Sequence, residues 1–175
     1  MAEDGLFDGQ RFELIEGDLI EKMGQNPPHA FTIRVVVAWL IRVFGNELVQ
    51  VQLPIEVAPK DQERSSPEPD IAVLIEVKPD YQTRHPRGDE LLLAVEVADS
   101  SSQFDLTVKA GLYARAVVPE YWVLDIANRW LVVHRHPLDG EYRQVTRLGE
   151  PETISVDYGA THSVVISQLM PARSI

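Results

Sequence analysis

The sequence predicts an α/β fold in which a mixed β-sheet is flanked by at least two helices, as one domain over residues 1–175. Three observations support this. A chain of 175 residues fits one domain and buries roughly 70% of the surface of its unfolded form. Apolar runs of strand length are separated by two longer segments with helical periodicity. The segments follow in the order strand, strand, helix, strand, which is typical of an α/β sandwich.

The first part of the chain predicts a β-hairpin, a helix and a strand. Short apolar stretches within residues 11–23 lie on both sides of a turn at Gly17, which favours an N-terminal hairpin. Over residues 29–44 apolar side chains recur at helical spacing, and Gly45 ends the run. A strand-like run covers residues 48–57.

The middle of the chain predicts the centre of the sheet. After a polar loop over residues 59–69, a short β-rich run covers residues 70–77. Residues 78–90 are polar and prone to form turns. Residues 91–97 are apolar on both strand faces except at Glu96, which indicates a central strand covered on both sides.

The last third predicts a helix and several strands. Residues 104–116 have helical spacing, with Asp105 in the first turn. Residues 121–124 and 130–133 predict a second hairpin. The remainder alternates weakly and predicts one or two edge strands at the C-terminal end.

Composition limits the classes of function. The chain has no cysteine, which excludes disulfides and thiolate metal sites and fits a reducing, cytoplasmic location. Its acidic beginning lacks the apolar segment of a signal peptide. The longest apolar run is interrupted by Arg34 and Arg42, so no membrane association is expected. The net charge of -11 counts against extensive non-specific nucleic-acid binding, although a small basic track remains compatible with it.

Two carboxylates predict an acidic site. An unpaired Glu96 in a buried strand would cost several kcal/mol, so it requires a partner, a cation or a proton. The alternative is that Glu96 lies hydrated or ion-paired at the end of its strand. Asp70 follows Pro69 at the start of an apolar strand, where an ordinary turn is the alternative. If the two strands are neighbours, we expect the carboxylates about 4–6 Å apart, where their oxygens suit Mg²⁺.

Lys109 is the third candidate. It lies in the helix that follows Glu96, with Leu112 and Tyr113 at helical spacing after it. From there its ammonium could reach back over the carboxylates and stabilise developing negative charge. The alternative is a solvated lysine on an exposed helix face.

These residues resemble a known group of enzymes. Pro69-Asp70, then Glu96 in an apolar strand, then a lysine is similar to the PD-(D/E)XK superfamily, which has the restriction-endonuclease-like fold. The stretches over residues 12–19, 95–101 and 118–125 resemble a large bacterial family of uncharacterised restriction-endonuclease-like proteins within it. The resemblance covers nearly the whole chain.

The resemblance implies a set of site residues. Asp70 and Glu96 would be metal ligands, the main-chain carbonyl of Val97 would be a third, and Mg²⁺ would be the cofactor, with Mn²⁺ as a substitute. The superfamily usually has its lysine two residues after the acid, where this chain has Ala98. Lys109 would replace it from the next helix, and this displacement bears on whether the protein is active.

Further residues have open roles. Glu13 matches an acid that recurs in the family, and it is either another ligand or a solvent-facing strand residue. His29 would contact a phosphate or support the site, but a polar residue near a helix start is the favoured interpretation. The loop from Lys78 to Arg87 carries three cations and is the best candidate for contacting DNA, with an ordinary solvated loop as the alternative.

The resemblance therefore predicts a metal-dependent endonuclease that hydrolyses DNA. The alternative is a catalytically silent module of the same fold that binds nucleic acid or protein. A generic binding domain is the least favoured, because it would give Glu96 no purpose. A homodimer is compatible with all three.

Overall fold

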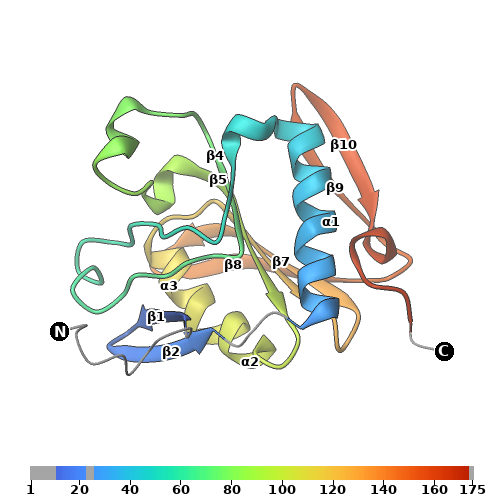
Figure 1. Cartoon of the computed structure of the whole chain (residues 1–175), viewed down its shortest axis with the longest axis horizontal. Coiled ribbons are helices and arrows are strands. Elements are labelled where there is room, and N and C mark those ends of the chain that lie inside the picture. The colour runs from blue at the N-terminus through green and yellow to red at the C-terminus, as the bar shows by residue number, and fades with distance from the viewer. Residues whose placement is uncertain (1–10, 23–25, 174–175) are drawn as a thin grey trace.

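The computed structural model describes residues 11–22 and 26–173, and its centre is a six-stranded sheet in the order β3-β4-β5-β6-β7-β8 (Figure 1). Neighbouring strands are antiparallel except β5 and β6, which are parallel. The predicted mixed sheet is therefore confirmed. Its strands are β3 (Val49–Val51), β4 (Ile71–Leu74), β5 (Leu91–Ala98), β6 (Glu120–Asp125), β7 (Trp130–Leu138) and β8 (Glu141–Gly149).

Helices cover both faces of the sheet, as predicted. Helix α1 (Pro27–Phe44) stacks Trp39 on Trp122 of β6, with ring centroids 6.2 Å apart. Helix α3 (Ala110–Arg115) packs Tyr113 against Tyr121, the adjacent residue of β6, at 4.8 Å. Because successive strand residues point to opposite faces, the two helices lie on opposite sides.

Helix α1 begins two residues before the predicted start. Asn26 caps it by accepting a hydrogen bond from the His29 N–H, and prolines occupy its first turn. It spans 18 residues and, among the described residues, is the one helix long and apolar enough to cross a membrane. Here it lies against the sheet with Val36 and Leu40 fully buried, as a core helix does.

The helix predicted over residues 104–116 is present but not uniform. It consists of α2 (Ser102–Phe104), the π-helical segment η4 (Asp105–Lys109) and then α3. Asp105 and Lys109, at the two ends of η4, are both buried. Single π turns inside helices are frequent at functional sites, and this one carries two charged residues into the interior.

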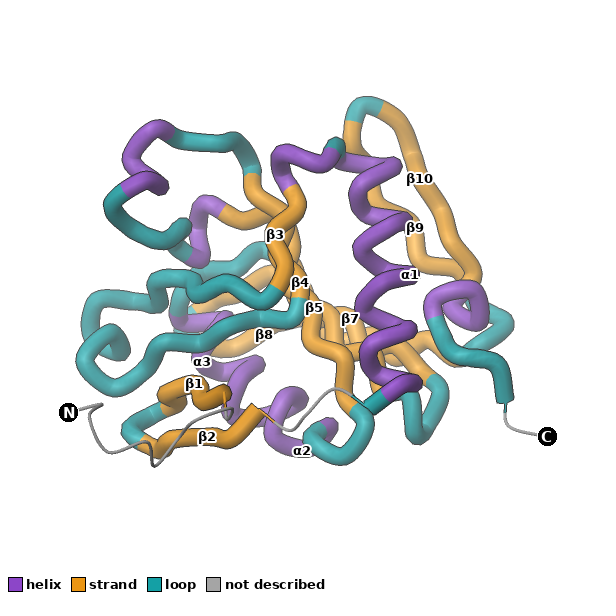
Figure 2. Tube along the Cα trace, in the orientation of Figure 1, coloured by secondary structure: helices purple, strands orange, loops and turns teal. Residues whose placement is uncertain are grey.

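Two hairpins complete the fold. The predicted N-terminal hairpin is present as β1 (Arg11–Ile15) and β2 (Asp18–Lys22), and it lies beside α2 and α3 (Figure 2). The C-terminal region holds more strands than the predicted one or two. Besides β8 it forms β9 (Thr153–Tyr158) and β10 (Ala160–Val165), a hairpin that packs against α1 through Phe44 and Tyr158.

The prediction of a strand over residues 48–57 is mostly wrong. Only Val49–Val51 pairs as a strand, because Gln52 has a left-handed φ of 51° and Pro54 follows. The run predicted over 70–77 likewise ends at Leu74. The short 3-10 helices η2 (Pro79–Gln82), η3 (Gly88–Glu90), η1 (Asn46–Leu48) and η5 (Ile166–Leu169) lie in the connections.

Candidate active site

The pairing of β4 with β5 brings Asp70 to Glu96. Ile71 pairs with Val95, so one further step of the same antiparallel register sets Asp70 across from Glu96. Directly opposed residues of an antiparallel pair point to the same face. The Val97 N–H donates to Asp70 Oδ2 at 2.9 Å, and both carboxylates are at most 4% exposed. The predicted adjacency of the two strands is confirmed; the 4–6 Å separation of the carboxylates stays a prediction.

Lys109 points into this site from the end of η4. Its Nζ lies 2.9 Å from Glu96 Oε1, 2.6 Å from Glu13 Oε1 and 3.9 Å from Asp105 Oδ1. The lysine is 3% exposed, so it is not a solvated surface residue. The predicted contact between Lys109 and Glu96 is confirmed.

Tyr113 holds Glu96 from the next turn of the helix. Its hydroxyl donates to Glu96 Oε1 at 2.8 Å, so this oxygen accepts hydrogen bonds from both Lys109 and Tyr113. Burial and the nearby Glu96 charge raise the pKa of Tyr113 well above its usual value. The phenol therefore stays protonated and acts as a fixed donor.

Glu13 reaches the site from the N-terminal hairpin. Besides its contact with Lys109, its Oε2 accepts a hydrogen bond from the Glu68 N–H at 3.2 Å. Glu13 is 5% exposed, which decides against a solvent-facing strand residue. The β1–β2 hairpin thus covers the site and contributes a carboxylate to it.

His29 lies at the mouth of the site rather than outside it. Its Nε2 is 3.5 Å from Asp70 Oδ2, and its side chain is 18% exposed. Burial disfavours the charged ring, but the Asp70 carboxylate and the Val97 carbonyl favour it, so the pKa of His29 is raised. Its Nδ1 is buried with no hydrogen-bond partner in the described part of the chain.

The environment of Asp70 favours its charged form. Burial alone would raise the pKa of Asp70, but the hydrogen bond from His29, the charge of Lys22 and the Val97 N–H together lower it. Gln52 Nε2 is a further donor, at 3.4 Å from Asp70 Oδ1. Asp70 is therefore an ionised carboxylate at neutral pH.

The site as a whole carries excess negative charge. Of the four buried carboxylates, those of Glu13, Glu96 and Asp105 lie within 3.9 Å of the Lys109 ammonium, whereas Asp70 lies beside His29. Burial raises the pKa of Glu96, and the nearby carboxylates of Asp70, Asp105 and Glu13 raise it further. Lys109 opposes these effects, but the pKa of Glu96 remains above its usual value. Burial opposes the charge on Lys109, but Glu96, Glu13 and Asp105 outweigh this and raise its pKa. One lysine does not neutralise these acids, and an added cation would.

The donor chemistry fits a hard divalent ion. Mg²⁺ is usually held by one or two carboxylates and keeps several waters. Asp70, Glu96 and the Val97 carbonyl offer such a set of oxygens at one edge of β5. Within residues 11–22 and 26–173, no three Asp, Glu or His side chains are grouped closely enough to hold a metal ion by themselves. A bound ion would thus depend on the main-chain carbonyl and on water.

The cations of the loop expected to contact DNA are paired with acids of this chain. Its cations Lys78, Arg84 and Arg87 all lie within 3.2 Å of the Glu90 carboxylate, which is 4% exposed. Each cation also pairs with a second acid: Lys78 with Glu76, Arg84 with Asp80 and Arg87 with Asp89. They do not form a free basic track.

Three site residues were missed at the level of sequence. The sequence assigns no role in the site to Asp105, to Tyr113, or to Gln52 within the predicted strand over 48–57. The spacing of Asp105, Lys109 and Tyr113, each four residues apart, was the signal available, because such residues share a helix face.

Comparison with known proteins adds to this geometry. A family model, Uma2, described as "Putative restriction endonuclease", matches residues 4–164. A crystal structure described as a "putative nuclease belonging to DUF820" from Anabaena variabilis ATCC 29413 superposes with a TM-score of 0.69. The two are 18% identical, and the match covers 90% of this chain and 88% of that one, which shows a shared fold. No curated protein matches the chain.

Proposed function

This chain belongs to the Uma2 restriction-endonuclease family, and from that premise we propose that it is a metal-dependent endonuclease that hydrolyses DNA phosphodiester bonds. The observation that carries the proposal is the group of four buried carboxylates at the β4–β5 pair, three of which contact Lys109. Burying that much uncompensated charge is costly for folding alone. A role in binding a cation and a phosphate would explain why these buried carboxylates are present despite their unfavourable effect on folding.

Asp70, Glu96 and the Val97 carbonyl would hold Mg²⁺, with Mn²⁺ as a substitute. Such an ion, when bound, activates water as a nucleophile and stabilises negative charge on a phosphate oxygen. Asp70 is suited to this role because its neighbours already favour the ionised form. Tyr113 and Lys109 fix the Glu96 carboxylate through its Oε1.

The remaining residues would act on the phosphate. The Lys109 ammonium, held at 2.6 Å by Glu13, supplies a fixed positive charge next to the carboxylates and would stabilise charge that develops in the transition state. Glu13 is thus a positioning residue for Lys109. His29, whose Nε2 lies 3.5 Å from Asp70 Oδ2, would lie beside a phosphate bound at the metal.

A catalytically silent module of the same fold is the second candidate. The net charge of -11 favours it, as does the use of Lys78, Arg84 and Arg87 by Glu90, because both weaken attraction for a nucleic acid. Metal binding without cleavage would be its signature.

The test measures metal binding and cleavage on the same proteins. With Mg²⁺ or Mn²⁺, wild type should nick or cut supercoiled, linear and single-stranded DNA, and chelation should stop it. Asp70→Asn and Glu96→Gln should each lower the rate at least about 100-fold, the scale of one lost transition-state contact. The exposed acid Glu76, paired with Lys78 at 3.6 Å, offers the control Glu76→Gln, which should cut like wild type.

Calorimetry of Mg²⁺ binding then separates the outcomes. Weaker binding by both site variants, with normal binding by Glu76→Gln, supports the assigned ligands. Equal binding by all proteins would remove Asp70 and Glu96 from the metal site. Wild type that binds Mg²⁺ but cuts none of the substrates would favour the silent module.

A further inference from the structure

The Lys109 ammonium is already held by the acids of the site. Its Nζ lies 2.6 Å from Glu13 Oε1 and 2.9 Å from Glu96 Oε1, and the lysine is 3% exposed. A phosphate would reach this ammonium only in competition with two buried carboxylates. A cation that is not paired with acids would bind a substrate phosphate more readily, so the surroundings of the site were searched for one.

Lys22 of β2 is such a cation. Glu13 pairs with Ile20 across the N-terminal hairpin, and Lys22 follows Ile20 by two residues. Directly paired residues point to one face of the hairpin, as do alternate residues of a strand, so Lys22 shares the face that brings Glu13 to Lys109. Lys22 is half-buried, and Figure 1 shows β2 running toward α2, the helix that precedes η4.

The Lys22 ammonium is anchored to a neutral group. Its Nζ donates to the main-chain carbonyl of Glu68, two residues before Asp70, at 2.5 Å. Its charge also acts on Asp70, where it helps to lower the pKa of that carboxyl. Within the described residues, no carboxylate lies within 4.0 Å of Lys22 Nζ. A substrate would therefore break no ion pair in order to take this ammonium.

We propose that Lys22 binds a phosphate of the nucleic-acid substrate on the hairpin side of Asp70, an inference that rests on the proposed nuclease function. The ammonium would exchange the Glu68 carbonyl for a phosphate oxygen. An anionic oxygen attracts an ammonium more strongly than a neutral carbonyl does, and lysine commonly binds phosphate as a point charge. The two lysines then have different roles: Lys22 contacts the substrate, and Lys109 stays with its carboxylates.

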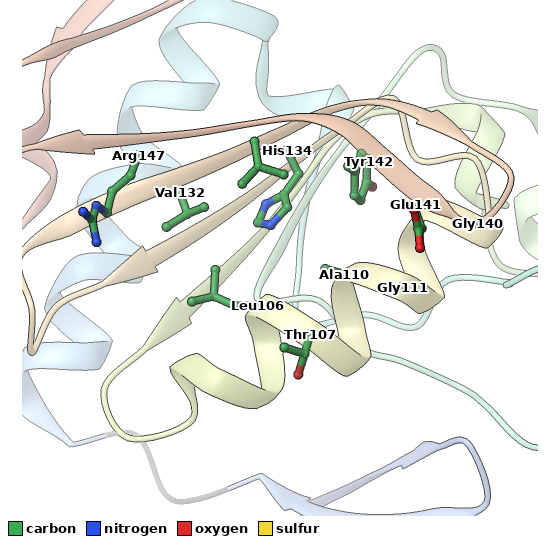
Figure 3. Close-up of a pocket in the computed structure, with 11 residues that line it drawn as sticks. Leu106, Thr107, Ala110, Gly111, Val132, His134, Gly140, Glu141, Tyr142 and Arg147 are labelled. Carbon is green, nitrogen blue, oxygen red and sulfur yellow. The ribbon is translucent and has the colours of Figure 1, made fainter.

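Arg147 offers a matched cation away from the site. It lines a groove of about 750 Å³ between the helical segment and the strands β7 and β8 (Figure 3). Lys109 and Tyr113 of the same helical segment point to Glu96 instead, so the groove lies on another face of the helix. Arg147 is exposed and, like Lys22, has no carboxylate within 4.0 Å in the described part of the chain. It should not meet a phosphate bound at Asp70.

The first experiment measures DNA affinity at several salt concentrations with Ca²⁺, which takes oxygen ligands as Mg²⁺ does, and checks the DNA for cuts afterwards. Lys22→Gln should bind about tenfold more weakly, the effect of one lost hydrogen bond to a charged group. Its log–log salt slope on duplex DNA should be smaller by about 0.9, the value for one phosphate contact. Lys22→Arg should restore both quantities, and Arg147→Gln should match wild type.

The comparison of Gln with Arg separates substrate binding from a structural role. A lysine that only tethers the hairpin to the Glu68 carbonyl would be replaced equally well by either side chain, because both donate hydrogen bonds. Equal affinities of Lys22→Gln and Lys22→Arg would therefore overturn the proposal, as would an equal loss in Arg147→Gln. In steady-state cleavage with Mg²⁺, Lys22→Gln should raise KM about tenfold with kcat near the wild-type value, the signature of lost substrate binding.

The outcomes also distinguish this inference from the proposed function. Cleavage by wild type, together with unchanged affinity and salt slope in Lys22→Gln, would overturn the role of Lys22 and leave the nuclease in place. DNA binding that depends on Lys22 without any cleavage would support the role of Lys22 and reject the nuclease. A wild type that binds no DNA would overturn both.

Discussion

Two buried glutamates lie near opposite ends of strand β5, and they differ in how many cations contact each carboxylate. Glu90, just before the strand, is 4% exposed and accepts hydrogen bonds from Arg84, Lys78 and Arg87. The Arg87 backbone N–H adds another at 2.9 Å. Glu96, within the strand, is 3% exposed and has one cation, Lys109, which it shares with Glu13.

The difference separates a carboxylate that its neighbours stabilise in the charged form from one that they do not. Hydrogen bonds from Arg84 lower the pKa of Glu90 far below its usual value, although burial opposes this. Burial raises the pKa of Glu96, and the surrounding carboxylates add to the effect. Glu90 is satisfied by its own neighbours and fixes a loop. Glu96 still requires positive charge, which is a property of sites that bind ligands.

The largest expected effect on folding comes from Lys109→Met. It removes the ammonium that contacts Glu13, Glu96 and Asp105, and loss of one member of a buried ion pair costs about 3–5 kcal/mol. Urea unfolding in a chelating buffer measures the change in the free energy of unfolding. Lys60→Met, at an exposed lysine, should change it little. A stability loss no greater than that of Lys60→Met would contradict the view that Lys109 neutralises the site.

A smaller loss is expected for Glu90→Gln. The amide cannot accept as strongly from three cations, but Lys78 and Arg87 are 33% and 50% exposed and can turn to solvent. The expected decrease in the free energy of unfolding is about 2 kcal/mol, the scale of hydrogen bonds to a charged group. The same urea experiment measures it, with Glu76→Gln as the exposed control. Cleavage by the folded variant should be unchanged, and its loss would link this cluster to the site.

The smallest effect on folding is expected for Glu96→Gln. The amide oxygen can still accept from Tyr113 and Lys109, and one of four crowded carboxylates is removed. In metal-free buffer the free energy of unfolding should stay within about 1 kcal/mol of wild type and move in the stabilising direction, as often happens when a functional residue is replaced. A loss as large as that of Glu90→Gln would show that both glutamates serve the fold alike.

The central elements could be predicted because their patterns are local. Residues 91–97 show two apolar faces interrupted by Glu96, and residues 29–44 show helical periodicity with a clear stop. The family motif then linked Asp70, Glu96 and Lys109. What failed were features set by single backbone angles: the left-handed φ of Gln52 ended a strand that its side chains favoured.

The number of cations that surround each buried glutamate could not be predicted from the sequence. Glu90 lies in a polar stretch, where an acid is normally solvated, and its burial depends on three cations folding over it. Glu13 gave no local sign that it meets Lys109, which lies 96 residues later in the chain. Such encounters depend on long-range packing, and a count of net charge along the chain does not contain them.

The contribution of Glu13 to the site has a consequence for the order of folding. Glu13 lies in the first hairpin and Lys109 in η4, so more than half of the chain must be arranged before they meet. Contacts between residues far apart in sequence close large loops and form slowly. During synthesis, the hairpin leaves the ribosome long before its lysine partner exists. The complete acidic site is therefore expected to form late in folding, and a partly folded chain lacks it.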